Sequence, residues 1–295
     1  MSTPHAAAAY PVELQAQVDS YLDELRFARE PATAGLEEAM RYSLLAGGKR
    51  IRPVLTLATA EALERPSAEV LPLAAAIELI HTYSLIHDDL PAMDDDRLRR
   101  GQLTCHVAYG EDVAILAGDG LFAEAMRLVL EQQTGEPGLV LAALRAVVDA
   151  AGVGGMVGGQ YLDVTAADDS GAELRHLHEL KTGRLIGASV ECVLHLNGLT
   201  GPATIGLRRF AAELGVLFQI VDDILDVTGD EAELGKPRGS DERHGKRTYV
   251  SVFGLDRARE LAAESHGNAR AALSEAQGRT GALEQITDYI LTRQQ

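Results

Sequence analysis

The chain has 295 residues, 46% of them hydrophobic, and a formal net charge of −17 at pH 7. Such an acidic surface argues against nucleic acid or an anionic membrane as the main partner, although it leaves room for a local basic pocket. Cys105 and Cys192 are the only cysteines, which gives no disulfide framework and favours a reducing compartment, so we expect a cytoplasmic protein.

In chain order, the predicted elements are helical throughout. Residues 1–11 lack the basic start and apolar core of a signal peptide and are expected to be disordered. The helices that follow are predicted at residues 12–29, 35–45, 54–64, 71–90, 113–131, 138–151, 174–196 and 207–227, with further amphipathic helices from Tyr249 to Ile290. No alternating run is long enough for a sheet, and no repeat or low-complexity linker divides the chain. We therefore predict one all-α domain over residues 1–295, built as a helical bundle.

Two of these helices, residues 71–90 and 207–227, are apolar on nearly every face. This pattern is typical of helices buried all round, and we expect the two to face each other inside the bundle. Polar or charged residues interrupt every apolar stretch before about 18 residues, so no membrane span is expected.

Each of the two buried helices ends in a cluster of aspartates. The first cluster runs from Asp88-Asp89 to Asp94-Asp95-Asp96, and the second contains Asp222-Asp223 and Asp226. Two carboxylates about 5 Å apart repel each other by roughly 3 kcal/mol at an effective dielectric constant near 20. Carboxylates this dense beside apolar residues need a countercharge, and the hard cation Mg²⁺ fits them best. A merely solvated acidic surface is the alternative, and two clusters on apolar helices argue against it because unpaired buried carboxylates are costly.

Helix geometry treats the two clusters differently. Asp222 and Asp226 are four residues apart and project from one helix face. Asp88 and Asp94 are six apart, which a straight helix would place about 120° apart around its axis. Pro91 lies between them and breaks the helix, so the chain can fold Asp94 back towards Asp88.

Basic residues supply the other half of the predicted site. They occur at Lys49, Arg50 and Arg52, at Arg99-Arg100, at Lys181 and Arg184, and at Lys236 and Lys246. Basic groups suit phosphate oxygens and carboxylates suit Mg²⁺, so the combination indicates a diphosphate substrate.

These motifs resemble, in order, those of the trans-prenyl diphosphate synthases, and most closely the bacterial farnesyl diphosphate synthase group. The matching segments are Gly47-Gly48-Lys49-Arg50-Ile51-Arg52-Pro53, the aspartates from Asp88 to Asp94, Arg99-Arg100-Gly101, Gly158-Gly159-Gln160, Lys181-Thr182-Gly183, and Gln219 ahead of Asp222 to Asp226. The resemblance implies an isoprenoid synthase type bundle around a central cavity, a homodimer, and Mg²⁺-dependent head-to-tail prenyl transfer.

The resemblance also assigns roles to single residues. The carboxylates expected to bridge three Mg²⁺ ions to an allylic diphosphate are Asp88, Asp94 and Asp222, with Asp226 in support. Groups expected to hold the same diphosphate are Arg99, Lys181, Lys236 and Lys246, with Thr182 and Gln219 lining its site. The second substrate, isopentenyl diphosphate, is expected at Lys49, Arg52, His81 and Arg100. Asp88, Asp94, Asp222, Lys181 and Arg99 form the expected catalytic set.

Product length rests on the residues before the first aspartates. Helix geometry places Ser84 one turn below Asp88 and Tyr83 about 140° round from it, so geometry alone does not select Tyr83 as the cavity floor. The resemblance does select it, because an aromatic residue five positions before the motif is similar to fifteen-carbon synthases. A geranylgeranyl diphosphate synthase is the main alternative; a terpene cyclase and an inactive regulatory homologue are the others.

Two smaller features have ordinary structural interpretations. The glycine-rich stretch 152–159 follows a helical pattern, so close helix packing explains it better than dinucleotide binding. His176 and His178 are expected to face solvent.

Overall fold

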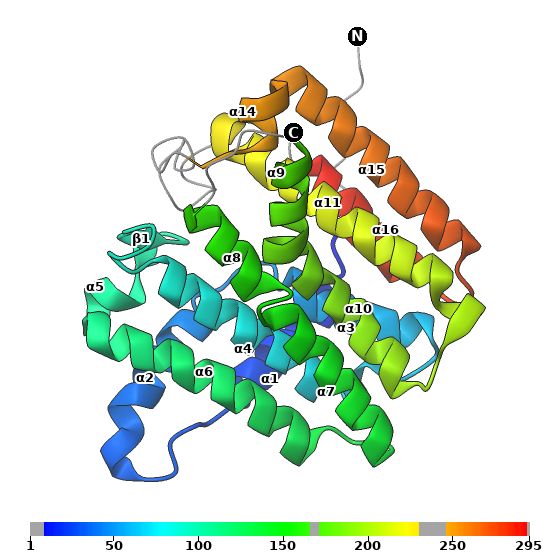
Figure 1. Ribbon diagram of the computed structural model, residues 1–295. Helices are drawn as coiled ribbons and strands as arrows, with labels where there is room; N and C mark the ends of the chain where they lie inside the picture. Colours follow the sequence, from blue (N-terminus) through cyan, green and yellow to red (C-terminus); the bar gives the residue numbers. More distant parts are fainter. Residues whose placement is uncertain (1–8, 166–170, 230–245, 294–295) are drawn as a thin grey trace.

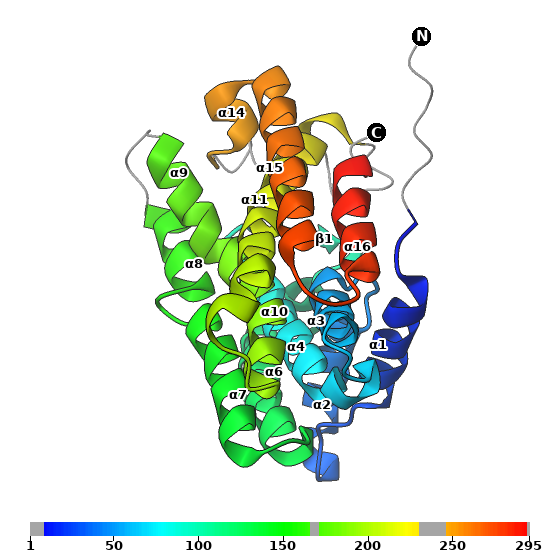
Figure 2. The same ribbon diagram turned by 90° about the vertical axis from the view of Figure 1, so that its right-hand side faces the viewer.

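The computed structural model describes residues 9–165, 171–229 and 246–293. Figures 1 and 2 show helices that surround a central pair, α3 and α4. The first helices are α1 (Val12–Glu24), α2 (Ala34–Leu44), α3 (Ile51–Ala62), α4 (Leu71–Asp88), α5 (Cys105–Tyr109), α6 (Glu111–Gln132), α7 (Pro137–Ala151) and α8 (Met156–Thr165). The later ones are α9 (Gly171–His178), α10 (Arg184–Leu196), α11 (Ile205–Thr228), α14 (Tyr249–Phe253), α15 (Leu255–Glu275) and α16 (Gly281–Thr292). The all-α prediction is confirmed.

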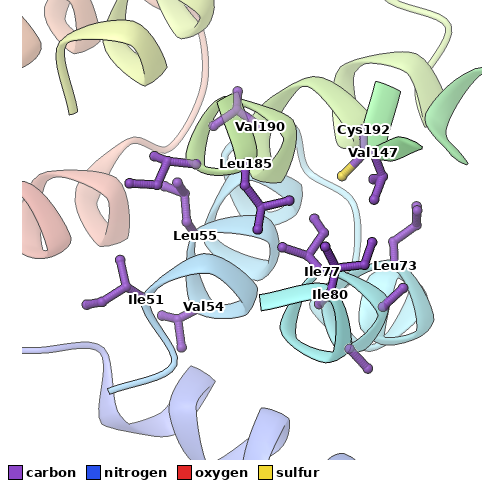
Figure 3. Close-up of a cluster of buried hydrophobic side chains, with 14 of the residues drawn as sticks. Ile51, Val54, Leu55, Leu73, Ile77, Ile80, Val147, Leu185, Val190 and Cys192 are labelled. Atoms are coloured by element: carbon purple, nitrogen blue, oxygen red, sulfur yellow. The ribbon is translucent and has the colours of Figure 1, made fainter. Parts of the chain in front are cut away.

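The core forms where α4 is enclosed by other helices. α4 packs against α6 and α3, and it also contacts α1, α2, α7 and α10. Figure 3 shows Val54 of α3, Ile77 of α4, Val147 of α7 and Leu185 of α10 in one buried cluster. Each such side chain stabilises the fold by about 1.5–3 kcal/mol through its burial. The prediction that α4 is buried all round is therefore confirmed.

The second apolar helix, α11, is less enclosed than its sequence predicted. It packs against α15 on one side and α10 on another, but Arg208 and Arg209 are exposed and pair with Glu191 and Glu275. The prediction of burial on every face was wrong for this helix, because Arg208, Arg209, Ala212 and Asp222 remain exposed between the elements that pack on it.

Strands were not predicted, and the described residues contain only a short hairpin. β1 (Leu98–Arg99) pairs antiparallel with β2 (Gln102–Leu103). Arg100 and Gly101 form the turn, both with positive φ (53° and 76°), as in the two-residue turns that suit hairpin twist. Two residues per strand are too few for the alternation that marks a strand in a sequence.

Two predicted helices differ from those in the structure. α1 ends at Glu24 rather than residue 29, because the Glu37 carboxylate accepts from the backbone N–H of Phe27 and Arg41 donates to the Leu25 carbonyl. The helix predicted over 174–196 contains a π-helical turn at Glu179–Gly183, labelled η3, between α9 and α10.

The N-terminal segment is ordered earlier than expected. The Tyr10 hydroxyl donates to the Lys49 carbonyl at 2.6 Å, and its ring packs on Tyr289 with centroids 4.8 Å apart. The expectation of disorder was therefore wrong for Tyr10, because its ring and hydroxyl both find partners; residues 1–8 lie outside the described residues.

Two helical stretches, 67–88 and 137–165, are long and apolar enough to cross a membrane by length and composition alone. Within the tested windows, 67% of the first and 44% of the second is buried inside the protein. Core helices pass the same test, so these stretches are weak evidence, and the expectation of no membrane span is not confirmed.

Candidate active site

A cavity of about 670 Å³ lies between α4, α8, the π-helical turn and α11. The predicted site residues that line it are Arg52, His81, Tyr83, Ser84, Asp88, Asp94, Arg99, Arg100, Lys181, Thr182, Gln219, Asp222 and Lys246. Two others among the described residues, Lys49 and Asp226, are not part of its wall, and Lys236 lies outside the described residues. Acidic and basic groups far apart in the sequence thus meet around one space.

A larger groove of about 1030 Å³ lies elsewhere, between α7, α10 and α11. Of the basic residues in the predicted site, Arg184 lines this groove, and none of the predicted aspartates does; His178 is the described residue common to both walls. Four charged residues of this groove pair with one another, Arg184 with Glu179 and Arg208 with Glu191. We therefore place the chemistry in the smaller cavity.

The first aspartate cluster folds back on itself as Pro91 predicted. α4 ends at Asp88, and the Asp94 N–H donates to the Asp88 carbonyl at 2.9 Å. The Asp94 carboxylate accepts from the Lys246 ammonium at 2.5 Å. Burial raises the pKa of Asp88 to about 6, and the charges of Lys181 and Lys246 oppose that rise. Asp88 is therefore a carboxylate whose ionised form would gain from a cation.

Asp89, the second aspartate of the first pair, has a different partner. The buried Asp89 accepts three hydrogen bonds from the Arg99 guanidinium: Nη2 donates to Oδ1 at 2.5 Å, and Nε donates to Oδ1 at 2.8 Å and to Oδ2 at 3.0 Å. This bidentate pair fixes Arg99 beside the cavity. Its neighbour Arg100 donates to the Gly47 carbonyl. Gly48 has a φ of +115°, which side-chain-bearing residues rarely adopt, so glycine is favoured where the hairpin meets the 47–53 loop.

Within the 47–53 loop, the three basic residues have separate environments. Arg50 is buried and pairs with Glu78 and Asp19, each at 2.9 Å, so it supports the loop. Arg52 faces the cavity; burial lowers its pKa to about 10, and its Nε, also buried, has no hydrogen-bond partner. Lys49 instead lies over the Tyr289 ring, 5.5 Å from the centroid. Of the two residues of this loop that were expected to hold the second diphosphate, Arg52 lines the cavity and Lys49 does not.

His81 lies next to Arg52 on the cavity wall. Burial, followed by the charge of Arg52, lowers the pKa of His81 well below its usual value. Its ring is therefore neutral at pH 7 and offers one N–H rather than a positive charge.

The second aspartate cluster separates by depth along α11. The Asp222 side chain is 55% exposed and faces the cavity, 3.8 Å from the Arg293 guanidinium. Asp226 is 3% exposed. Asp223 is also buried; it accepts from Gln219 Nε2 and from the Tyr249 N–H, both at 2.7 Å. The shared helix face predicted for Asp222 and Asp226 therefore brings Asp222 alone to the wall of this cavity.

A hydrogen-bonded chain links Asp223 to the π-helical turn. The Thr182 hydroxyl donates to the side-chain Oε1 of Gln219 at 2.8 Å, and the side-chain Nε2 of Gln219 donates in turn to the Asp223 carboxylate. Lys181, the preceding residue, pairs with Asp163 of α8 at 2.6 Å. The two predicted diphosphate ligands of this turn are thus each held by a defined partner.

His178 does not face solvent, contrary to expectation, whereas His176 does. The His178 ring is 9% exposed and stacks on Tyr249 with centroids 5.5 Å apart. Its Nε2 lies 4.0 Å from Asp223, and burial lowers its pKa to about 4. A polar sequence around the histidine concealed that α11 and α14 close over it.

Sequence reasoning missed three residues that the structure places at or against the cavity. Gln160 and Phe218 line it, and Arg293 packs its guanidinium 4.6 Å from the Phe218 ring centroid, beside Asp222. Both polar atoms of the Gln160 amide are buried without a partner. Gln160 stood within a matched motif, which was a usable signal; an arginine near the end of the chain gave none.

Tyr83 and Ser84 both line the cavity below the first aspartates. The Tyr83 ring makes edge contacts with His87 and with Phe122 of α6, at centroid distances of 5.7 and 5.3 Å. The Ser84 hydroxyl donates to the His81 carbonyl at 2.8 Å. Tyr83, the larger of the two side chains, is thus the one that packs against other rings.

The donor set fits magnesium in one particular manner. Within the described ranges, no three histidine, cysteine or acidic side chains gather closely enough to enclose an ion by themselves. Mg²⁺ commonly takes one or two carboxylates and completes its shell with substrate phosphates and water. Asp88, Asp94 and Asp222 face one cavity that also carries phosphate-binding bases, so they suit ions bound together with a diphosphate.

Comparison with known proteins gives consistent matches over this whole fold. A family model described as polyprenyl synthetase matches residues 33–290. The geranylgeranyl pyrophosphate synthase of Capsicum annuum chloroplasts is 43% identical over 289 residues, covering 96% of this chain and 78% of its own. Farnesyl diphosphate synthase of Geobacillus stearothermophilus is 43% identical over 293 residues, covering 95% and 99%. Among solved structures, a geranyltransferase from Helicobacter pylori complexed with magnesium and isoprenyl diphosphate has a TM-score of 0.82 at 31% identity, covering 100% and 97%.

Proposed function

The chain belongs to the polyprenyl synthetase family and is a prenyltransferase, and from its cavity we propose that it joins isopentenyl diphosphate head to tail to dimethylallyl and then geranyl diphosphate. We propose farnesyl diphosphate as its main product. The observation that carries this proposal is a single cavity with carboxylates at Asp88, Asp94 and Asp222 and with two separate groups of basic residues.

The allylic diphosphate would occupy the side of the cavity between the two aspartate clusters. Asp88, Asp94 and Asp222, with Asp226 in support, would hold Mg²⁺, three ions by analogy with the family. When bound, magnesium supplies positive charge that stabilises the departing diphosphate. The basic groups proposed for the same diphosphate are Arg99, Lys181, Lys236 and Lys246. Lys246 already neutralises Asp94 at 2.5 Å, so it can turn from that carboxylate to a phosphate oxygen.

Isopentenyl diphosphate would bind at Arg52 and Arg100, with neutral His81 donating a hydrogen bond. Lys49 would join them by leaving the Tyr289 ring, over which it lies outside the cavity wall. The buried Nε of Arg52 lacks a protein partner, and a phosphate oxygen would satisfy it. Two diphosphate sites favour chain elongation over a terpene cyclase, which needs one. Both aspartate clusters are present, which disfavours an inactive regulatory homologue.

Chemistry would follow from this arrangement. The allylic carbon–oxygen bond ionises, the double bond of isopentenyl diphosphate attacks the resulting cation, and the released diphosphate takes the proton that is lost. The protein excludes water with the apolar wall formed by Leu85, Met93, Ile115 and Phe218, which protects the cation from being quenched. The hydrogen bond from the Thr182 hydroxyl to the side-chain Oε1 of Gln219 holds the π-helical turn beside that wall.

Product length is the finer part of the proposal. Tyr83 would stop the growing chain as the floor of the cavity, and the rings of Phe122 and His87 behind it would resist displacement. The alternative is a geranylgeranyl diphosphate synthase, favoured by the relative from Capsicum annuum that is as similar as the farnesyl synthase.

We further propose a cytoplasmic homodimer in which residues 1–295 act as one polyprenyl synthase domain. α6 carries an exposed apolar stripe of Leu116, Phe122 and Leu130, which repeats with helical spacing and suits a second copy of the chain. Leu130→Glu should lower the mass measured by sedimentation; an unchanged dimer would remove this stripe from the interface.

One assay tests the central proposal. The purified protein is incubated with isopentenyl diphosphate, Mg²⁺ and each allylic diphosphate in turn, and product lengths are identified. Asp88→Ala should reduce turnover by orders of magnitude. Asp95→Asn is the matched control, because Asp95 is exposed, lies off the cavity wall and has a left-handed backbone that asparagine tolerates. Absence of elongation with every substrate pair would refute the proposed function.

A further inference from the structure

Asp163 has no role in the reaction described above, yet it holds one of the proposed substrate ligands. Its carboxylate lies 2.6 Å from the Lys181 ammonium, and the two side chains are 11% and 22% exposed. Both line the cavity. A charged pair this shielded from water is held more firmly than a surface ion pair.

The backbone of Lys181 is fixed by the same helix that carries Asp163. Gly159 of α8 comes so close to the π-helical turn that a Cβ on it would lie 2.2 Å from the Lys181 nitrogen and 2.5 Å from its Cα. Gly159 and Asp163 are four residues apart and therefore share a face of α8. α8 thus holds Lys181 at both ends: Gly159 packs against its backbone, and Asp163 pairs with its ammonium.

The π-helical turn is the third part of this grip. Single π-helical turns within α-helices are rare and occur frequently at functional sites. Here the turn spans Glu179–Gly183 and contains Lys181 and Thr182, which both reach the cavity. Thr182 is tied to Gln219 of α11, so the turn is held between α8 and α11.

The charges around Lys181 indicate where its ammonium would go without Asp163. Lys181 and Asp88 line the same cavity, and so does Asp94, which folds back beside Asp88. The other cavity lysine, Lys246, pairs directly with a carboxylate of the first cluster, Asp94. A Lys181 without Asp163 would be drawn to Asp88 in the same way.

We propose that Asp163 is a positioning residue that holds Lys181 away from Asp88, leaving the Asp88 carboxylate open to a cation and the ammonium aimed at the diphosphate. This role rests on the proposed function, because it assumes that Lys181 and Asp88 serve one magnesium diphosphate group.

The test begins with binding and does not require turnover. Calorimetry with inorganic diphosphate and MgCl₂ is carried out on the wild type, Asp163→Ala, Asp163→Asn and Glu179→Ala. Asp163→Ala should weaken binding roughly ten- to a hundredfold and should raise the Mg²⁺ concentration needed. Asp163→Asn, which keeps the size and one acceptor oxygen, should fall between it and the wild type. Glu179→Ala removes an exposed ion pair with Arg184 from the same turn and should bind as the wild type does.

Two further measurements separate positioning from general damage. Adding Lys181→Ala to Asp163→Ala should cost nothing beyond Lys181→Ala alone, since a positioning residue has no effect without its target. In steady-state assays, Asp163→Ala should raise KM for the allylic substrate and leave KM for isopentenyl diphosphate unchanged. Wild-type binding in Asp163→Ala, additive loss in the double variant, or no binding of magnesium diphosphate by the wild type would each overturn the inference. Binding without elongation would refute the proposed function alone.

Discussion

Gly159→Ala places one methyl group where α8 meets the π-helical turn, and its consequence can be worked out from the structure. The added Cβ would lie 2.2 Å from the Lys181 nitrogen, whereas real Cβ atoms keep at least 3.0 Å from their neighbours. The obstructing atoms are backbone, so no side-chain rotation relieves the contact. The two segments must therefore separate by about 1 Å, a displacement that can lower a rate about a hundredfold when it moves a group at the reacting centre.

Stability should fall as well, by about 1–3 kcal/mol, the usual cost of overpacking a close contact. The assay is kcat/KM for the allylic substrate, measured beside thermal unfolding followed by circular dichroism. Gly187→Ala is the matched control: it lies in α10, a Cβ there meets nothing within 4 Å, and alanine favours helix over glycine by up to about 1 kcal/mol. A Gly159→Ala protein with wild-type kcat/KM and unfolding temperature would refute the reasoning that α8 positions Lys181.

Three other predictions concern the cavity and its support. Asp88 has a pKa raised from 3.8 to about 6, so the folded protein loses stability as pH rises through that window and the buried carboxyl ionises. Asp88→Asn removes that charge and should therefore raise the unfolding temperature at pH 8 without Mg²⁺. The same variant should abolish any stabilisation by added MgCl₂ and diphosphate. Tyr83→Ala should shift products towards twenty carbons, as chromatography would show, and Phe122→Ala should do so less strongly; an unchanged distribution in both returns Tyr83 to an ordinary core role. Glu78→Ala leaves the Arg50 guanidinium buried without its 2.9 Å partner and should cost about 3–5 kcal/mol in urea unfolding; a loss below about 1 kcal/mol would mean that Asp19 suffices.

Local features of the fold followed from the sequence because they depend on neighbours along the chain. The apolar pattern of α4 and the helix break at Pro91 needed nothing but spacing, and the break returned Asp94 to Asp88 as expected. The acidic and basic motifs predicted a site for magnesium and a diphosphate, and the family resemblance implied a central cavity; most of the predicted residues line one cavity.

Tertiary packing decided which way each side chain points and how deeply it is buried. Helix spacing states which residues share a face, but it does not state what covers that face. Asp222 and Asp226 share a face of α11, yet Asp222 is open to the cavity and Asp226 is buried. His178 looked polar and exposed, and it became buried because α11 and α14 close over it.

The sequence by itself determined the helices, the break in the first aspartate cluster and the kinds of charge that this protein brings together. Only the tertiary structure decided that Asp89 and Asp223 turn to structural partners and that Asp163 grips Lys181. The physical reason is that a carboxylate's role depends on the cation or N–H that reaches it. That partner lies 10 residues away for Asp89, 18 for Asp163 and 152 for Asp94, and helix spacing alone does not identify it.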